Sequence, residues 1–307
     1  MRIGIIGTGR IANRFVPEAG CVSTVEVVSV YNPHADSAEK FAATHVIKAF
    51  SDLDTFFESV DAVYVASPHE THYEYTKAAL NAGKHVLCEK PMVFGKAQAL
   101  ELFKLAKDRG VILMEGLKTA YSPGFAKILE LAKSGAVGEI KYIEACFTKL
   151  TEESGREYAN PQTGGSFTEL GTYVILPVLY LLGCEYSDVS FDSVCNAKDL
   201  DTFTRATIQY EGGFASVICG LGVKSEGRLM ISGTKGYILV DAPWWKPTHI
   251  SVHYEDASKV DTYECEFEGD GLRYEIEAFA QAITPQLEEI SVAMSGVMER
   301  FLAERKS

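Results

Sequence analysis

Up to about residue 118, short apolar runs alternate with stretches in which apolar residues recur at every third or fourth position. Runs of about four to eight apolar residues are typical of buried strands, whereas apolar residues at every third or fourth position are typical of amphipathic helices. The clearest helix is residues 96–109, because Ala99, Leu102 and Ala106 share one face and Gly110 follows as a stop signal. The other predicted helices are residues 36–43, 52–58 and 71–82, and the predicted strands are residues 3–6, 25–31, 62–66, 85–88 and 111–115.

The pattern changes after about residue 120. A helix is predicted at residues 125–133, and a long apolar helix follows Gly164-Gly165 and ends at Leu182. Residues 202–210 and 214–219 are rich in β-branched and aromatic side chains, and the turn residues between them predict a hairpin. Further strands are predicted at residues 228–232, 237–240 and 248–254, and two closing helices at residues 272–283 and 287–304.

These two patterns predict two domains. Strands that alternate with helices are typical of a doubly wound parallel sheet covered on both faces, so residues 1–118 are predicted to be an α/β domain. Strands without intervening helices predict an α+β domain with a mainly antiparallel open sheet over residues 119–307. A chain of 307 residues fits this division at about 100–200 residues per domain.

Charge and composition narrow the possible partners. Lys and Arg number 29 against 42 Asp and Glu, so the net charge is −13, which makes nucleic acid or a membrane surface an unsuitable main partner. No apolar run approaches the ~20 residues that span a bilayer, and the strand that opens the chain leaves no room for a signal peptide. The seven scattered cysteines have no metal-ligand spacing, so we expect a cytoplasmic protein with reduced thiols and no metal site.

A glycine-rich segment follows the first predicted strand. Gly7-Thr8-Gly9-Arg10-Ile11-Ala12 fits the pattern G-x-G-x-x-G/A, in which the first glycine permits a tight turn and the second lets a pyrophosphate approach the backbone. The small sixth residue lets the helix pack closely on the strand, and the helix N-terminus faces the phosphates. These six residues are therefore predicted to bind a dinucleotide in a Rossmann domain, although a glycine turn in another α/β fold is the alternative.

The end of the second predicted strand bears on the choice between NAD and NADP. An acidic residue there would bind the free ribose hydroxyl of NAD, but Glu26 lies at the start of the strand. The residue at its carboxyl end is Asn32, which does not repel a phosphate, and His34 or Arg10 could help to hold one. We therefore predict NAD or NADP as the cofactor, and slightly favour NADP or the use of both.

Two further segments carry a family resemblance. Residues 66–72 read Ala-Ser-Pro-His-Glu-Thr-His, and residues 83–91 end in Glu89-Lys90-Pro91, directly after the strand predicted at residues 85–88. With residues 121–138, 164–173 and 274–279, they make nearly the whole chain similar to the Gfo/Idh/MocA oxidoreductases. Known members are glucose–fructose oxidoreductase, inositol dehydrogenase and dimeric dihydrodiol dehydrogenase. The Glu-Lys-Pro motif is the more specific part, because many families share the glycine turn.

The resemblance implies the two catalytic residues. Lys90 would lie where nicotinamide and substrate meet and would stabilise charge on the reacting oxygen. Tyr173 fills the acid/base position, and because a phenol is a poor base near neutral pH, it would depend on the Lys90 cation. Tyr173 could instead be a core aromatic residue of the apolar helix. The remaining implied cofactor contacts are Ser67, Pro68, His69 and Glu89, with Lys90 itself; His72 could be another, or could serve in helix capping or packing.

Substrate contacts are also implied in the second domain. Glu169 replaces the usual aspartate four residues before the acid/base, so the two share one helix face, and the longer side chain should reshape the pocket. An acid that only stabilises the helix N-terminus is the alternative for Glu169. The other predicted substrate-binding residues are Lys118, Arg156, Tyr158 and Tyr121. Trp244-Trp245 could belong to an interface or to a pocket wall.

The predicted function is an NAD(P)-dependent dehydrogenase or reductase. Hydride would pass between nicotinamide and a secondary alcohol or carbonyl of a sugar, cyclitol or dihydrodiol-like substrate. Two alternatives keep the fold: an NAD-dependent glycosidase that oxidises its sugar transiently, and a non-catalytic NAD(P)-sensing regulatory protein. The open sheet of the substrate domain is expected to form a homodimer or a higher even oligomer.

Overall fold

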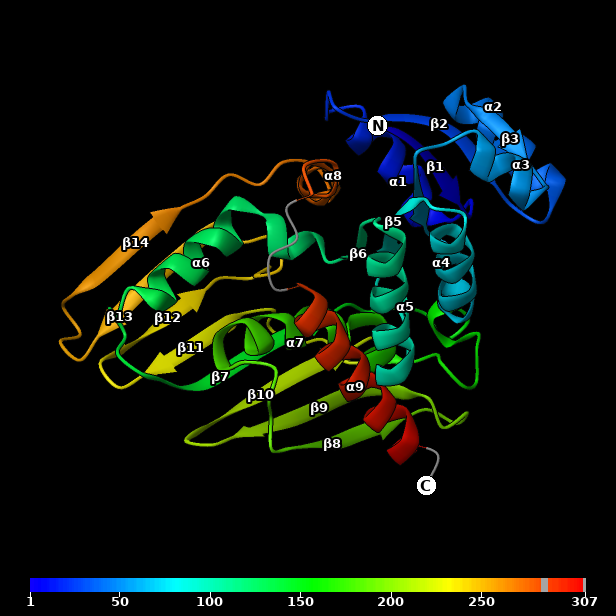
Figure 1. Ribbon diagram of the computed structural model, residues 1–307. Coiled ribbons are helices and arrows are strands. Elements are labelled where there is room, and N and C mark those ends of the chain that lie inside the picture. The colour runs from blue at the N-terminus through cyan, green and yellow to red at the C-terminus, as the bar shows by residue number, and fades with distance from the viewer. Residues whose placement is uncertain (283–286, 306–307) are drawn as a thin grey trace. The chain divides into compact units, whose positions relative to one another are not determined.

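The computed structural model of the chain describes residues 1–282 and 287–305 and divides into two compact units (Figure 1). One unit contains Met1–Lys118 and Glu268–Ser295, and the other contains Thr119–Phe267 and Gly296–Ser307. The sequence pattern assigned all of residues 119–307 to one domain, whereas the structure groups Glu268–Ser295 with the first unit.

The described part of the first unit contains a six-stranded parallel sheet in the order β3-β2-β1-β4-β5-β6. This is the strand order of a dinucleotide-binding Rossmann fold, so the predicted fold class is confirmed for this unit. The short β3 escaped prediction because its three residues form no apolar run. The strands are β1 (Arg2–Ile6), β2 (Glu26–Tyr31), β3 (Lys48–Phe50), β4 (Ala62–Val65), β5 (His85–Glu89) and β6 (Leu113–Gly116).

Helices follow the strands of this sheet as the apolar spacing predicts. Helix α5 spans the predicted residues, and Gly110 ends it in the left-handed region with a φ of +67°. Inside the unit, Phe15 of α1 stacks on Tyr64 of β4 with ring centroids 3.8 Å apart. The helices are α1 (Arg10–Ala19), α2 (Ala35–His45), α3 (Leu53–Glu58), α4 (His72–Asn81), α5 (Lys96–Arg109) and α8 (Leu272–Ala280), with a short 3-10 helix at His69–Thr71.

An ion pair ties the late segment to α1. The buried Glu18 carboxylate accepts hydrogen bonds from the backbone amides of Asp270 and Arg273 and from the Arg273 guanidinium, at 2.9–3.2 Å. Burial raises the pKa of Glu18, but the hydrogen bonds from Arg273 and Asp270 outweigh it, so the pKa lies below its ordinary value. The charged pair therefore holds α8 on the Rossmann unit, and α1 and α8 are in contact.

The described part of the second unit contains an eight-stranded sheet in the order β14-β13-β12-β11-β7-β10-β9-β8. Among the described strands of this sheet, only the β7–β10 pair is parallel, which confirms the predicted mainly antiparallel sheet. The predicted hairpin joins β9 to β10, and Gly212 in its turn has a φ of +83°. The strands are β7 (Ile140–Thr148), β8 (Asp188–Cys195), β9 (Asp201–Tyr210), β10 (Gly213–Gly220), β11 (Leu229–Gly233), β12 (Gly236–Val240), β13 (His249–Tyr254) and β14 (Val260–Glu264).

Two helices lie along this sheet. The apolar helix α7 (Ser166–Leu182) packs against β7, β9 and β10, and α6 (Pro123–Lys133) packs against β12 and β13 (Figure 1). Short 3-10 helices occur at Lys118–Tyr121 and Arg156–Tyr158. Helix α9 spans Leu287–Arg305, and its Phe301 contacts Phe167 of α7 with ring centroids 4.6 Å apart.

The helix predicted at residues 272–283 ends earlier in the structure. Helix α8 stops at Ala280, and residue 283 lies outside the described residues. Within the described ranges, no helix combines the length and apolar character needed to cross a bilayer.

Candidate functional site

The glycine-rich turn after β1 has the geometry that the motif requires. Gly7 has a φ of +107°, and a Cβ there would lie 2.6 Å from the backbone oxygen of Ala66. A side chain at this position would therefore be strained and would clash with the end of β4. A Cβ at Gly9 would meet no described atom within 4 Å, so the backbone at Gly9 is open to approach by a ligand.

Helix α1 begins directly at this turn. Gly9 precedes the helix in an extended conformation, no side chain caps the helix, and its first turn holds no acidic residue. Its first helical hydrogen bond runs from the amide of Asn13 to the Gly9 oxygen, at 3.2 Å. A helix N-terminus of this kind attracts an anion, so Thr8 to Ala12 can hold a pyrophosphate. Arg10 is exposed at this end, and Ala12 is buried where the helix packs on the sheet.

The carboxyl end of β2 meets the same turn. The Asn32 side-chain amide donates to the Thr8 hydroxyl at 2.9 Å, and the Asn32 side-chain oxygen accepts from the His34 backbone amide at 3.0 Å. Glu26 is exposed at the opposite end of β2. The position that usually holds an acid for the ribose hydroxyls is therefore occupied by a neutral amide, and the exposed His34 lies two residues beyond it.

The loop after β4 carries Ser67, Pro68 and His69. The Thr71 hydroxyl lies 2.7 Å from both the Ser67 hydroxyl and the Pro68 oxygen, which fixes the turn. His72 is fully buried, with one ring nitrogen 2.9 Å from the Ser67 oxygen and the other 2.9 Å from the Pro91 oxygen. Both ring nitrogens of His72 therefore face backbone carbonyls of the protein itself, and the buried ring presents neither of them to solvent.

Glu89 and Lys90 lie at the carboxyl end of β5, the sheet edge where Rossmann folds bind their ligands. The Glu89 carboxylate accepts from the Tyr64 hydroxyl at 2.5 Å and from the Lys90 backbone amide at 3.2 Å. These two bonds turn the Glu89 carboxylate toward the protein interior. The Lys90 residue is 9% exposed.

Two buried carboxyl groups near this edge were not singled out from the sequence. Glu115 in β6 accepts from the Met92 amide at 2.8 Å, and burial raises its pKa to about 7. Glu275 in α8 is fully buried, and neither of its carboxyl oxygens has a hydrogen-bond partner in the described part of the chain. Burial, followed by the nearby Glu89 charge, raises the pKa of Glu275 well above its ordinary value. An acid inside an apolar strand such as β6 is the one sequence signal that could have identified Glu115.

Lys118 follows β6 and was predicted to bind substrate. Its ammonium group donates to the backbone oxygen of Asp270 at 2.7 Å, so it also braces the segment before α8. The positive charge of Lys118 lowers the pKa of Glu275 and so opposes the rise caused by burial.

Tyr173 lies on α7 in the second unit, within a row of aromatic rings. Its ring meets Phe147 of β7 edge-on, with centroids 5.2 Å apart, and Phe147 stacks on Trp245 at 3.5 Å. Trp244 is fully buried, and its indole nitrogen donates to the Cys146 oxygen at 2.9 Å. The structure therefore separates the two tryptophans: Trp244 is a core residue, whereas Trp245 extends the aromatic row beside Tyr173.

Two predicted substrate-binding residues pair with each other. The Arg156 guanidinium donates to the Glu169 carboxylate at 2.9 Å and lies 3.6 Å from Glu157. The Glu169 side chain is 13% exposed and that of Arg156 is 56% exposed. Glu169 therefore takes part in a side-chain ion pair on α7, in addition to its position at the helix N-terminus.

The two predicted tyrosines lie in different surroundings. Tyr121 ends the 3-10 helix at Lys118–Tyr121 and is partly exposed. Tyr158 is only 2% exposed, its hydroxyl has no hydrogen-bond partner among the described residues, and burial raises its pKa. Tyr158 is therefore enclosed by protein on nearly all sides, whereas Tyr121 keeps some exposed surface.

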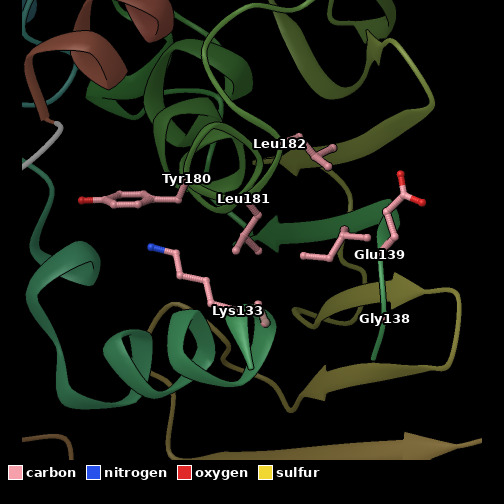
Figure 2. A pocket seen from close by; sticks show the side chains of 8 residues that line it. Lys133, Gly138, Glu139, Tyr180, Leu181 and Leu182 are labelled. Atoms are coloured by element: carbon pink, nitrogen blue, oxygen red, sulfur yellow. The ribbon is translucent and has the colours of Figure 1, made fainter. Parts of the chain in front are cut away.

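A hollow of about 330 Å³ lies elsewhere in the second unit, beside the ends of α6 and α7. Figure 2 shows Lys133, Glu139 and Tyr180 among the residues that line it. None of the predicted site residues lines this hollow, so it is not the candidate site. In the described ranges, no group of three or more His, Cys, Asp or Glu side chains could hold a metal ion.

Comparison with known proteins agrees with this geometry. Residues 1–117 match the GFO_IDH_MocA model, described as an oxidoreductase family with an NAD-binding Rossmann fold, and residues 125–239 match the GFO/IDH/MocA C-terminal domain. The scyllo-inositol 2-dehydrogenase (NADP(+)) IolU of Bacillus subtilis is 29% identical over 92% of this chain and 88% of that protein. The trans-1,2-dihydrobenzene-1,2-diol dehydrogenase of Xenopus laevis is 28% identical over 98% of this chain and 96% of that protein.

A solved structure extends the likeness to three dimensions. KijD10, a 3-ketoreductase from Actinomadura kijaniata in complex with NADP and TDP-benzene, aligns with a TM-score of 0.83 and 25% identity. The alignment covers 97% of this chain and 96% of KijD10. The two family models together span more than half of the sequence. The chain therefore belongs to the GFO/IDH/MocA family of oxidoreductases, with an NAD-binding Rossmann fold.

Proposed function

We propose that the protein transfers a hydride between NADP and a secondary alcohol or carbonyl on a ring-shaped polyol. The observation that carries this proposal is the location of Lys90. This cation follows β5 at the carboxyl edge of a Rossmann sheet, and the same sheet has an open glycine turn after β1. A nicotinamide cofactor bound along that edge supplies or accepts the hydride.

The chain contributes charge and proton transfer to this reaction. The Lys90 ammonium hydrogen-bonds the substrate oxygen and stabilises the negative charge that develops on it. In the reduction direction the Tyr173 hydroxyl donates its proton to that oxygen, and in the oxidation direction it takes the proton back. Gly7 to Ala12, Asn32, His34 and Ser67 to His69 hold the cofactor, and Glu89 orients the backbone at Lys90 through its bond to the Lys90 amide.

The preference for NADP is supported at the end of β2. Asn32 brings no negative charge to this position, and the exposed Arg10 and His34 can bind a 2′-phosphate. IolU is named as an NADP(+) enzyme, and KijD10 was solved with NADP. We extend that preference to this chain, with use of NAD as a weaker activity.

The substrate class is supported by the surroundings of Tyr173. The row formed by Tyr173, Phe147 and Trp245 offers aromatic surface to the apolar face of a ring, and the Arg156–Glu169 pair offers polar groups to its hydroxyls. Two relatives are named for cyclitol and dihydrodiol substrates. We propose a cyclitol, sugar or dihydrodiol-like ring, with Lys118 and Tyr121 as further contacts.

A substrate panel tests this function. Purified protein is mixed with NADP or NAD and with single cyclitols, aldoses and dihydrodiols, and reduction of nicotinamide is followed by absorbance at about 340 nm. We expect turnover with at least one ring polyol, and faster turnover with NADP than with NAD. The proposal would be overturned if the protein bound NADP tightly but oxidised none of these compounds with NADP and reduced no ring ketone with NADPH.

We further propose a cytoplasmic homodimer or higher even oligomer that assembles through the sheet of the second unit. Helix α7 covers one face of that sheet, and Phe214 of β10, 45% exposed, contacts the ring of Tyr142 with centroids 4.9 Å apart. An exposed aromatic side chain on a sheet favours association with a second copy. Equilibrium sedimentation should give an even multiple of the chain mass, and a monomer mass would contradict the assembly.

A further inference from the structure

His72 lies between two loops that the proposed function uses. One ring nitrogen faces the oxygen of Ser67, in the loop after β4, and the other faces the oxygen of Pro91, directly after Lys90. Strands β4 and β5 are neighbours, with Val65 paired to Cys88. The imidazole therefore bridges the cofactor loop and the Lys90 segment at the carboxyl ends of two adjacent strands.

The bridge has an unusual hydrogen-bond requirement. Both partners of the ring are carbonyl oxygens, which only accept, and a neutral imidazole has a single N–H to donate. The neutral ring therefore donates to one of the two carbonyls and packs its other nitrogen against the second, and only a protonated ring would donate to both. Two carbonyl oxygens at 2.9 Å from the ring nitrogens indicate polar contacts in addition to simple packing.

The surroundings of the His72 ring shift its pKa in opposite directions. Burial lowers the pKa of His72, and the Lys90 charge lowers it further. The two carbonyls and the Glu89 charge raise this pKa, but burial outweighs them. The His69 ring packs edge-on against His72, with centroids 5.5 Å apart. His72 therefore senses both Glu89 and Lys90, the two charged residues that follow one another at the end of β5.

We propose that His72 is a positioning residue that ties the Ser67–His69 loop to the Lys90–Pro91 segment and so sets Lys90 relative to the cofactor. The inference rests on the proposed roles of Lys90 and of the cofactor loop. A misplacement of about 1 Å in a reacting group can cost about 100-fold in rate, so a lost bridge should reduce kcat more than cofactor affinity.

Three variants separate positioning from packing. His72→Phe keeps a buried ring but donates no hydrogen bond, whereas His72→Gln carries an amide nitrogen with two hydrogens for the two carbonyls. Thr76→Val changes a fully buried polar residue one turn further along α4 and is the matched control. We expect kcat to fall about 10- to 100-fold in His72→Phe, with the Kd for NADPH changed by less than about threefold. His72→Gln should recover part of kcat, and Thr76→Val should retain it.

A double-mutant cycle shows whether the effect passes through Lys90. In a Lys90→Arg background, His72→Phe should cost far less than in the wild-type background, because the residue that it positions is already impaired. The same loss in both backgrounds, or wild-type kcat in His72→Phe, would overturn the proposal.

Hydrogen exchange of the free protein provides a readout that needs no substrate. His72→Phe should speed amide exchange in residues 67–71 and 90–92 together, and Thr76→Val should not. Unchanged exchange in these two segments would reject the bridge. If the wild type shows no turnover on the panel, the proposed function fails, and the exchange result still decides whether His72 couples the loops.

Discussion

The side-chain amide of Asn32 donates to the hydroxyl of Thr8 at 2.9 Å, which joins the end of β2 to the glycine-rich turn. The same Asn32 side chain accepts from the His34 backbone amide, so its orientation is held from both sides. A neutral group is thus fixed at the position where Rossmann proteins commonly distinguish the two ribose forms. This pair connects the fold to the choice of cofactor.

Asn32→Asp should shift the preference toward NAD. A carboxylate at this position repels the 2′-phosphate and can accept from a free 2′-hydroxyl. We expect the ratio of the Kd values for NADPH and NADH to rise by about 10- to 100-fold, which corresponds to ~1.4–2.8 kcal/mol. Titrations of cofactor fluorescence measure both values. Glu26→Gln, at the exposed opposite end of β2, is the control and should leave the ratio unchanged.

Lys90→Met should abolish turnover while leaving the cofactor bound. Methionine has a similar length but no charge, so the oxygen loses its stabilising partner, whereas the glycine turn is untouched. We expect the 340 nm signal to fall by at least about 100-fold, with the Kd for NADPH changed only a few-fold. Full turnover in the variant would remove Lys90 from the mechanism.

Tyr173→Phe should lower kcat and preserve stability. The edge-on contact with Phe147 remains, but the hydroxyl that we propose as the proton donor is lost, so a decrease of about 100- to 10,000-fold is expected. Tyr180→Phe is the matched control, because Tyr180 lies on the same helix and lines the unrelated hollow. Equal activity in the two variants would show that Tyr173 is only a packing residue.

Glu115→Gln should remove a pH-dependent loss of stability. Burial raises the pKa of Glu115 in the folded protein to about 7, above its ordinary value of 4.5, so the folded state favours the protonated acid. The wild type therefore loses stability as pH rises from about 4.5 through about 7, by up to ~3 kcal/mol. The variant retains an oxygen for the Met92 amide and has no charge to bury.

Urea unfolding at pH 5.5 and pH 8 checks this expectation. The free energy of unfolding of Glu115→Gln, minus that of the wild type, should be larger at pH 8 than at pH 5.5. Other buried acids, such as Asp201 and Glu275, titrate alike in both proteins and cancel in the difference. The same difference in free energy at both pH values would contradict a buried neutral acid at position 115.

Much of the Rossmann unit could be predicted because its signals are local. Helix α5 was predicted residue for residue, since its apolar spacing and Gly110 act over neighbouring positions. The strands β3, β7, β8 and β14 were not predicted, because each mixes exposed or partly buried polar residues with its apolar ones. Three of them, β3, β8 and β14, lie at a sheet edge, whereas β7 lies inside the second sheet. Their pairing depends on the neighbouring strand and not on their own sequence.

In the candidate site, too, the features that depend on local sequence could be predicted and those that depend on distant packing could not. Loops that follow strand ends were predicted together, because parallel strands bring their carboxyl ends to one edge. The contacts of His72, the burial of Glu275 and the enclosure of Tyr158 arise only after distant segments pack, so the sequence pattern alone does not reveal them. The pairing of Arg156 with Glu169 likewise depends on where the polar loop folds back on α7.

The transfer of a labelled hydride tests the central claim most directly. NADPH deuterated at nicotinamide C4 is supplied to the wild-type protein with ring ketones, using each of the two C4 stereoisomers in turn, and the alcohol product is examined by mass spectrometry. The account predicts one deuterium on the product carbon from one stereoisomer and none from the other. An alcohol without deuterium from either stereoisomer, or no product with any ring ketone, would contradict direct hydride transfer by this protein.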